Sequence, residues 1–382
     1  MKIAIVSTYF GENIGGAEVS TNLLVEGLNK TKNQVKVITL NSLLQSIPTY
    51  LRAFLLNTNL LDVYISRYIY NQLCGKGFDI VHVQDLMILP ATVLAAKKLK
   101  LKVIATVRDL RFVCNLPICQ NQGKLYHNCL NTRYLNCLKR EANYQFGYPS
   151  LAYLIYPFIK GRAKVLRNAL NSTDKIIALT NFVKEVLYNS RIRTNIEVVH
   201  NPMPDWKPKP KLKNKGFIIL AGPGRLEPYK GFQLLIKIMP KILQKKKNAK
   251  LWIVGTGSYE NYLKKLSEKL NIRDSVIFFG KLSQEEVMKK YAECDIVAFP
   301  SIWLEAQGRV QLEAMAMKKP LIANNKGGII ETAGKENVCN FFDENELTKE
   351  IFKRRKPLKV RRELNIGAYV ESILRIYNEK EI

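Results

Sequence analysis

The sequence predicts an α/β protein with two doubly wound parallel sheets, each in a domain of its own. Short, continuous apolar runs alternate with helical patterns, as in proteins whose parallel strands are covered by helices. This alternation stops at residues 207–215, where proline and lysine alternate, and then begins again. A chain of 382 residues is long enough for two such domains.

In the first half, apolar runs predict strands at residues 2–7, 35–40, 78–83, 102–107, 175–179 and 196–199. A helix is predicted to begin at Gly15-Gly16, because apolar residues follow at helical spacing from Val19 to Leu28. Residues 42–70 are rich in leucine and aromatic residues and have few charges. They predict an amphipathic helix that belongs to the core or to an interface.

In the second half, strands are predicted at residues 216–221, 251–254, 275–279, 295–299 and 320–323, and helices at 232–243, 259–270, 284–293 and 366–379. We therefore place the first domain at residues 1–206 and the second at 216–365. Residues 207–215 are predicted to be a linker, because proline stiffens the chain and like charges extend it.

The chain is strongly basic, with 60 Lys and Arg against 32 Asp and Glu and a formal net charge of +28. This excess indicates an acidic partner: nucleic acid, an anionic membrane or a phosphorylated ligand. Residues 97–167 contain 14 Lys and Arg, with only Asp109 and Glu141 as acids. No RNA- or DNA-reading module is recognisable in the sequence, so nucleic-acid binding is the alternative and we expect no nucleic-acid partner.

Within this basic segment, the apolar and aromatic residues 151–159 lie between two groups of cations. The cations are Lys139 and Arg140 on one side and Lys160, Arg162, Lys164 and Arg167 on the other. The pattern is typical of a segment at an anionic lipid surface, and a buried helix with a solvated basic face explains it equally well. We find no secretory signal and no apolar run of about 18 residues. We therefore expect a cytoplasmic protein that can be peripheral at the inner face of the cell membrane.

The chain has seven cysteines, and Cys114, Cys119, Cys129 and Cys137 lie close together in the sequence. Their spacing does not match the CxxC pairs of common zinc sites, although four soft ligands in one loop still permit a structural zinc. Disulfides and unlinked thiols are the two alternatives.

Two loops that follow predicted strands contain glycines and are suited to phosphate. The first is Gly15-Gly16, which a tight turn explains equally well. The second is 222–231, where Arg225 and Lys230 bring two cations to the end of a strand. A guanidinium can bind a diphosphate bidentately and an ammonium adds a point charge, so we favour phosphate binding over solvated turn residues.

Two acids, Glu305 and Glu313, follow the strand at 295–299 with seven residues between them. Glu305 is predicted in a loop, and Glu313 within a helix that begins near Gly308. The N-terminus of a helix offers N–H groups to an anion. One carboxylate can therefore face a polar ligand, while the other reaches past the anion to a sugar hydroxyl.

Together these motifs resemble the GT-B glycosyltransferases of family 4, the retaining group, over essentially the whole chain. The motifs are Gly224-Arg225-Leu226, Lys230-Gly231, Gly255-Thr256-Gly257, Glu305 with Glu313-Ala-Met-Ala, Lys319-Pro320-Leu-Ile-Ala, Gly327-Gly328-Ile-Ile-Glu331, Gly15-Gly16-Ala17-Glu18 and Asp79-Ile80-Val81-His82. The resemblance implies two Rossmann-like domains that face a cleft, with the last helix, 366–382, returning to the first domain. The first domain would take the acceptor and the second a nucleotide sugar.

The resemblance also implies a role for each site residue. Arg225 and Lys230 would bind the diphosphate, Glu313 the ribose and Glu305 the transferred sugar. The remaining donor-binding positions would be Gly15, Gly16, Gly224, Gly257, Ala306, Gln307 and Gly308. The donor would be a UDP-, GDP- or ADP-sugar, and catalysis would need no metal. The leaving diphosphate would help to deprotonate the acceptor, with retention at the anomeric carbon.

The sequence departs from the family at two places in the site. Ala306-Gln307 stand where many members have proline and phenylalanine, and Arg108-Asp109 where many have His-Asp. Arg108 and Asp109 are therefore our catalytic candidates from the first domain, and His82 is expected to be structural.

The basic segment lies in the predicted acceptor domain, so we expect a lipid-linked or other glycan acceptor at an anionic membrane. This would suit glycan biosynthesis, including surface glycans and protein glycosylation. A GT-B protein that binds its ligand without turnover is a further alternative. The presence of Glu305, Glu313, Arg225 and Lys230 favours the enzyme.

Overall fold

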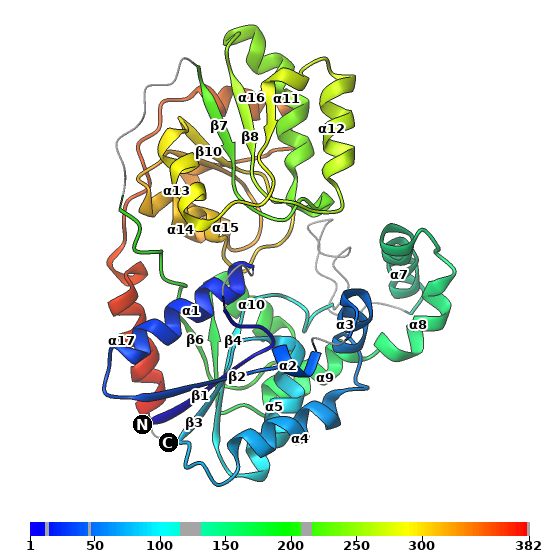
Figure 1. Ribbon diagram of the computed structural model, residues 1–382, viewed down its shortest axis with the longest axis vertical. Coiled ribbons are helices and arrows are strands. Elements are labelled where there is room, and N and C mark those ends of the chain that lie inside the picture. The colour runs from blue at the N-terminus through cyan, green and yellow to red at the C-terminus, as the bar shows by residue number, and fades with distance from the viewer. Residues whose placement is uncertain (12–14, 45–46, 115–130, 208–215, 380–382) are drawn as a thin grey trace. The chain divides into compact units, whose positions relative to one another are not determined.

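The computed structural model describes residues 1–11, 15–44, 47–114, 131–207 and 216–379 (Figure 1). The chain divides into two compact units: unit 1 comprises Met1–Asn201 with Ile366–Ile382, and unit 2 comprises Pro202–Asn365. Each unit has a six-stranded, fully parallel sheet with flanking helices. The predicted fold class of two Rossmann-like units is therefore confirmed.

Unit 1 has the strand order β2-β1-β3-β4-β5-β6. Its strands are β1 (Lys2–Ser7), β2 (Gln34–Thr39), β3 (Ile80–Val83), β4 (Lys102–Val107), β5 (Lys175–Ala178) and β6 (Ile196–Val198). Its helices are α1 (Gly16–Asn29), α2 (Asn41–Leu44), α3 (Thr49–Leu56), α4 (Asp62–Leu73), the 3₁₀ helix η1 (Leu86–Ile88), α5 (Leu89–Lys98), α7 (Asn131–Phe146), α8 (Leu151–Ile159), α9 (Arg162–Asn171), α10 (Asn181–Asn189) and α17 (Ile366–Asn378).

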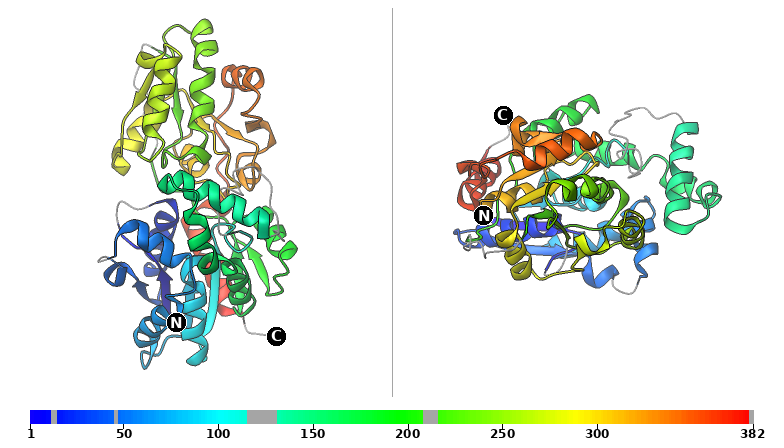
Figure 2. Two further views of the ribbon diagram at one scale, coloured as in Figure 1. Left: turned by 90° about the vertical axis from the view of Figure 1, so that its right-hand side faces the viewer. Right: turned by 90° about the horizontal axis from the view of Figure 1, so that it is seen from above.

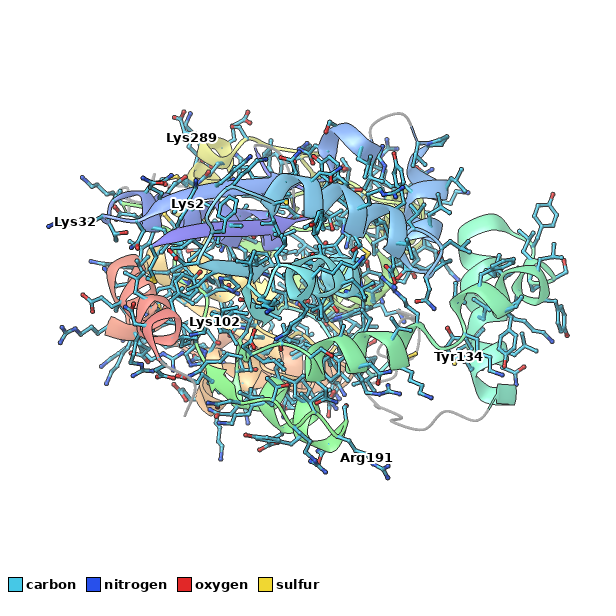
Figure 3. All side chains as sticks on the ribbon, turned by 90° about the horizontal axis from the view of Figure 1, so that it is seen from below. Lys2, Lys32, Lys102, Tyr134, Arg191 and Lys289 are labelled. Atoms are coloured by element: carbon cyan, nitrogen blue, oxygen red, sulfur yellow. The ribbon has the colours of Figure 1, made fainter. Side chains whose placement is uncertain are left out.

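The C-terminal helix α17 is part of unit 1 and lies beside α1 (Figure 1). Gly27 makes this close packing possible, because a Cβ there would come within 2.4 Å of the Val370 side chain. The Tyr377 hydroxyl of α17 lies 2.6 Å from the buried Nδ1 of His82. The Lys102 ammonium (Figure 3) donates to the Tyr377 carbonyl at 3.0 Å. The last helix is thus joined to β3 and β4 by polar contacts as well as by apolar packing.

The amphipathic pattern at residues 42–70 forms three helices, α2, α3 and α4, so the single helix predicted there is wrong. Pro48 precedes α3 and provides no N–H for a preceding turn of helix. Between α3 and α4, the Thr58 hydroxyl donates to the Leu55 carbonyl and accepts from the Leu60 N–H. These local hydrogen bonds compete with a continuous helix.

Unit 2 has the strand order β12-β11-β10-β7-β8-β9. Its strands are β7 (Ile218–Ala221), β8 (Lys250–Ile253), β9 (Val276–Phe278), β10 (Ile296–Phe299), β11 (Leu321–Asn324) and β12 (Val338–Cys339). Its helices are α11 (Phe232–Lys245), α12 (Glu260–Lys269), α13 (Gln284–Glu293), α14 (Arg309–Ala316), α15 (Ile329–Ala333) and α16 (Glu344–Phe352), with 3₁₀ helices η2 (Pro228–Lys230), η3 (Arg273–Ser275), η4 (Lys335–Asn337) and η5 (Arg362–Leu364).

The segment that leads into unit 2 packs against this unit before β7 begins. Met203 and Trp206 contact its apolar core, and the Met203 N–H donates to the Leu364 carbonyl at 2.8 Å. The first and last residues of unit 2 therefore lie side by side. Most of the predicted linker, residues 208–215, lies outside the described residues.

The order of strands reverses at one point in each sheet, which determines where a ligand can bind. In unit 2 the chain runs from β7 through β8 to β9 and then returns to the other side of β7 with β10. In unit 1 the equivalent point lies between β1 and β3. Loops diverge at such a point, so the carboxyl ends of β7 and β10 are the expected ligand position in unit 2.

None of the helices that the structure describes has the length and apolar character needed to cross a bilayer.

Candidate active site

A cation and a carboxylate meet at the point in unit 2 where the strand order reverses. Lys230 lies in the loop after β7 and Glu305 in the loop after β10, and Lys230 Nζ is 2.7 Å from Glu305 Oε1. The Ser301 hydroxyl donates to the same oxygen at 2.8 Å. Both side chains of the pair are mostly shielded from solvent, with exposed fractions of 24% for Lys230 and 15% for Glu305. The pair is therefore held in place and still reachable.

Glycine at position 231 lets the loops after β7 and β10 lie together. Gly231 has a φ of +77°, and a Cβ there would lie 2.1 Å from the Pro300 carbonyl oxygen. Next to it, the Tyr229 carbonyl accepts the N–H groups of Ile302 and Trp303 at 3.0 and 3.2 Å. A larger residue than glycine would separate the loops and move Lys230 away from Glu305.

The Gly255–Gly257 loop after β8 supports the loop that carries Arg225. A Cβ on Gly255 would lie 1.9 Å from the Gly224 carbonyl oxygen, and Gly224 N–H donates to the Val254 carbonyl at 3.1 Å. The two loops thus run backbone against backbone. Arg225 is exposed, and within the described parts of the chain it has no salt-bridge partner. Its guanidinium is available to an anion.

Behind Glu305, the loop after β11 fixes the backbone of the acid. Gly327 has a φ of +58° and approaches Glu305 so closely that a Cβ would lie 2.7 Å from the Glu305 carbonyl oxygen. The Gly328 N–H donates to that carbonyl at 2.8 Å. Buried Asn324 donates from Nδ2 to the Ser301 carbonyl at 3.0 Å. The Gly327-Gly328 motif therefore has a structural role, because it holds the backbone of the Glu305 loop in position.

Glu313 lies about one turn into α14 and has fixed partners for both carboxylate oxygens. The Tyr291 hydroxyl of α13 donates to Oε2 at 2.9 Å, and Arg309 Nε lies 3.6 Å from Oε1. Tyr291 is fully buried and its ring packs 6.0 Å from that of Trp206. Burial raises the pKa of Glu313, whereas Arg309 and the Tyr291 hydroxyl oppose this rise. The carboxylate is thus held in one orientation at the edge of the site.

The residues between the two acids are enclosed by protein. Ala306 and Gln307 are buried, and Gln307 Nε2 lies 3.4 Å from the Thr332 hydroxyl. Gly308 is the N-cap of α14, and a Cβ there would lie 2.3 Å from the Phe299 ring. No side chain caps this end of α14. The N-terminus of α14 therefore begins beside the Glu305 loop, as the sequence predicted.

In unit 1, the Arg108 guanidinium is bound to internal partners. It donates from Nη1 to Asn201 Oδ1 at 2.6 Å and from Nη2 to Gln84 Oε1. Asp109 accepts the Arg111 N–H at 3.0 Å. Burial raises the pKa of Asp109, and the Arg111 guanidinium opposes this rise. Arg108 therefore joins the ends of β3 and β4 to Asn201, the last residue of the first segment of unit 1, whereas Asp109 is a half-buried acid at the same sheet edge.

The remaining predicted residues of unit 1 are placed as follows. Gly15 is the N-cap of α1 and Gly16 its first residue, next to the point where the strand order reverses. His82 is fully buried between the hydroxyls of Tyr377 and Thr106, at 2.6 and 2.8 Å. Burial lowers the pKa of His82 to about 3, so it is neutral and structural.

The four-cysteine segment is described only in part. Cys114 is buried and Cys137 of α7 is half-buried, whereas Cys119 and Cys129 lie outside the described residues. Among the residues that the structure does describe, no group of three or more His, Cys, Asp or Glu could hold a metal ion. The zinc hypothesis stays untested.

Several residues that orient the acids were not predicted. Ser301 and Arg309 each precede a glutamate by four residues, a spacing that could have pointed to them. Tyr291 and Asn324 reach the site from other elements, and no local pattern indicates them. Together with the predicted residues, they place the Lys230 cation beside the ordered Glu305 carboxylate and a second ordered carboxylate, Glu313, in the helix that follows the same loop. Such an arrangement can bind a ligand in which a diphosphate joins two groups that both carry hydroxyls.

Two family models match the chain over most of its length. The model described as Glycosyltransferase Family 4 matches residues 14–205, and the model described as Glycosyl transferases group 1 matches residues 204–354.

A relative from Corynebacterium glutamicum is 37% identical over 120 residues, 30% of this chain and 31% of the relative. Its name is GDP-mannose-dependent monoacylated alpha-(1-6)-phosphatidylinositol monomannoside mannosyltransferase. The chain covers between 27% and 43% of the length of the first curated relatives that it matches.

Solved structures share the fold over nearly the whole chain. Sucrose-phosphate synthase from Thermosynechococcus elongatus superposes with a TM-score of 0.74 at 17% identity, covering 98% of both chains. Anabaena HepE in complex with UDP and glucose superposes with a TM-score of 0.63 at 17% identity, covering 98% of this chain and 99% of that one.

Proposed function

The chain belongs to glycosyltransferase family 4 and is therefore a transferase, and from this premise we propose that it transfers a sugar from a nucleotide diphosphate to an acceptor with retention of anomeric configuration. The observation that supports this most strongly is the Lys230–Glu305 pair, 2.7 Å apart, at the carboxyl ends of the neighbouring strands β7 and β10. A cation and an acid held together there can serve the two ends of one ligand: the phosphate and the sugar.

Lys230 and Arg225 are proposed to bind the diphosphate. Lys230 is fixed by Glu305, and exposed Arg225 lies in the same loop after β7, five residues before Lys230. A diphosphate carries more charge than one carboxylate, so the Lys230 ammonium would turn toward it on binding. Glu305 would then be released from its ion pair and face the sugar hydroxyls. This exchange couples donor binding to the positioning of Glu305.

The reaction itself breaks the bond between the anomeric carbon and the diphosphate oxygen, and forms a bond from the acceptor oxygen to the same face of the sugar. The acceptor proton passes to the leaving diphosphate. Negative charge develops on that diphosphate, and fixed cations that meet it are the largest expected contribution to rate. Lys230 and Arg225 are the groups that would supply this stabilisation. Arg108 and Asp109 remain predicted contributors from unit 1.

Glu313 is proposed to accept hydrogen bonds from the ribose hydroxyls. Its carboxylate is oriented by Tyr291 and Arg309 before any ligand arrives. A carboxylate that is already held in its binding orientation loses little conformational entropy when the ribose binds, which favours affinity. One relative is named for GDP-mannose and one structural neighbour is in complex with UDP. Because these nucleotides differ in their base, the base of this protein's donor has to be found by screening.

For the acceptor, we propose a lipid-linked glycan precursor at the inner face of the membrane. The basic excess of residues 97–167 lies in unit 1 and suits an anionic surface. The mannosyltransferase relative is named for a phosphatidylinositol mannoside, which is an acceptor of this kind. A role in surface-glycan assembly or protein glycosylation follows from such an acceptor.

Protection against heat unfolding by UDP-, GDP- and ADP-sugars tests the proposal. A donor at 100 times its dissociation constant should stabilise the protein by about 2.7 kcal/mol. Lys230→Ala should abolish this protection, and Glu313→Ala should weaken it.

Lys264→Ala is the matched control. Lys264 also forms an ion pair of 2.7 Å, with Glu260, but on the exposed surface of α12 in the same unit. This variant should keep full protection. If the Lys230 and Glu313 variants are protected as well as the wild type, the proposed donor site is wrong.

A further inference from the structure

Helix α8 has a sequence without a polar face. It reads Leu-Ala-Tyr-Leu-Ile-Tyr-Pro-Phe-Ile and contains no charged residue. A helix that is apolar all round is normally buried on every side. Here α7 and α8 lie beside each other at the edge of unit 1, away from its sheet (Figure 1, Figure 2). The position of α8 therefore does not match its composition.

One side of α8 packs against α7 in a small core of its own. Ala152 and Ile159 are buried there with Leu138 and Ala142 of α7. Tyr134 (Figure 3) donates from its hydroxyl to the Ile159 carbonyl at 3.4 Å. These contacts fix the rotation of α8 and so decide which residues face outward.

The opposite side of α8 exposes large apolar side chains. Tyr153, Leu154 and Phe158 have exposed fractions of 58%, 69% and 47%, and Pro157 is exposed between them. At 3.6 residues per turn, these positions share a continuous arc of about 140°. We call this arc the outer face of α8. A surface this apolar on one short helix indicates an interaction site.

Cations surround the outer face. The Lys139 ammonium lies 4.6 Å from the centre of the Tyr153 ring, and the Lys160 ammonium 5.2 Å from that of Tyr156. Lys160 and Lys164 are exposed at the carboxyl side of the helix. Such an apolar arc rimmed by cations is complementary to an anionic bilayer, where side chains enter the acyl boundary and cations meet the headgroups.

Two cations of this segment are not part of the rim. Arg162 is only 1% exposed, with Nη1 2.5 Å from Asp62 Oδ2, and Arg167 donates to the Phe112 carbonyl at 2.8 Å. Both arginines hold α9 against the body of unit 1. This anchors the element that follows α8, so the outer face is presented from a fixed base.

We propose that the outer face of α8 is the surface through which this protein docks on an anionic membrane. The inference deepens the proposed membrane-side acceptor and rests on it. Nucleic acid suits the site less well, because Leu154, with an exposed fraction of 69%, offers neither a hydrogen bond to a phosphate nor a ring on which a base could stack. A second copy of the chain would bring the same cations together and is disfavoured by like-charge repulsion.

Co-sedimentation with phosphatidylcholine vesicles, with and without phosphatidylglycerol, tests the docking surface. The full chain should bind the vesicles that contain phosphatidylglycerol, and Leu154→Ser should weaken binding about tenfold. The double change Lys160→Gln and Lys164→Gln should weaken binding about fivefold per charge, on the anionic vesicles only.

Leu94→Ser provides the matched control, because Leu94 is an exposed leucine (49%) on helix α5 of the same unit. It should bind like the wild type. The proposal is overturned if the wild type does not bind, or if Leu154→Ser binds as well as Leu94→Ser. It is also overturned if light scattering shows that Leu154→Ser instead dissociates a dimer. Nucleotide-sugar protection should be unchanged in all three variants, so a failure of docking and a failure of donor binding are told apart.

Discussion

Removing the hydroxyl of Tyr291 should weaken donor binding without touching any proposed ligand contact. In Tyr291→Phe the ring stays in place, and only the 2.9 Å hydrogen bond to Glu313 Oε2 is lost. The change therefore tests whether an ordered Glu313 matters to the site. We expect lower affinity for the nucleotide sugar and a shifted pH dependence.

The magnitude follows from the burial of the carboxylate. A hydrogen bond to a charged group contributes about 1.5–3 kcal/mol, equivalent to about 10- to 150-fold in a dissociation constant. The Glu313 side chain is 15% exposed, so water can replace the lost donor only in part. We therefore expect the affinity to fall by at least about tenfold.

The pH dependence gives a second measure. Burial already raises the pKa of Glu313, and the Tyr291 hydroxyl opposes that rise. Without the hydroxyl the pKa rises further, so the carboxylate takes up a proton at higher pH. If the ionised form binds ribose, affinity falls as pH drops, and the midpoint of this fall moves upward in the variant. A purely structural defect would not move this midpoint.

Titration calorimetry over a series of pH values measures both effects. Tyr377→Phe is the matched control: it also removes a buried hydroxyl contact, the 2.6 Å contact to His82, but in unit 1. It should lower stability and leave the donor affinity unchanged. Wild-type affinity together with an unchanged pH profile in Tyr291→Phe would refute the reasoning.

Three further predictions concern the fold beneath the site. Gly231→Ala should lower the unfolding midpoint and abolish nucleotide protection, because its positive φ and the Pro300 carbonyl leave no room for a methyl group; a thermal melt with ligand tests this. Because burial lowers the pKa of His82 to about 3 from 6.5, unfolding takes up a proton below pH 6.5 and stability falls as pH drops toward 3, by about 1.4 kcal/mol per pH unit. His82→Gln should flatten that slope in urea titrations, and an unchanged slope would contradict the assignment. Arg162→Met should cost about 3–5 kcal/mol by leaving Asp62 buried and unpaired, and adding Asp62→Asn should recover part of this in calorimetry.

Much of the architecture could be predicted, because buried parallel strands read as continuous apolar runs. The short strand β12 escaped prediction, since Val338–Cys339 is too brief to form a pattern. The breaks around Pro48 and Thr58 were also missed, because the apolar spacing continues through them. Hydrophobic periodicity records which residues are buried and carries little information on where a helix stops.

In the site, the motifs predicted which side chains lie at the strand ends of unit 2, but not which residues orient them. Lys230 and Glu305 are far apart in the sequence and meet because β7 and β10 are neighbours in the sheet. Tyr291 reaches Glu313 from another helix, a contact that no local spacing encodes. The catalytic role of Arg108 stays a prediction from the resemblance, and the sequence did not indicate that its guanidinium donates to Asn201 and Gln84. Side-chain partners of this kind depend on tertiary packing.

The hydrogen bond between Met203 and Leu364 has a consequence for how such a protein can diversify. It brings the ends of unit 2 together, so the whole of Pro202–Asn365 is a single insert in an otherwise continuous unit 1. Insertions with adjacent ends are tolerated well, because the host chain needs only a short gap to receive them. One recombination event of about this length could therefore exchange the whole of unit 2, to which we assign the donor. Unit 1, to which we assign the acceptor, would stay unchanged.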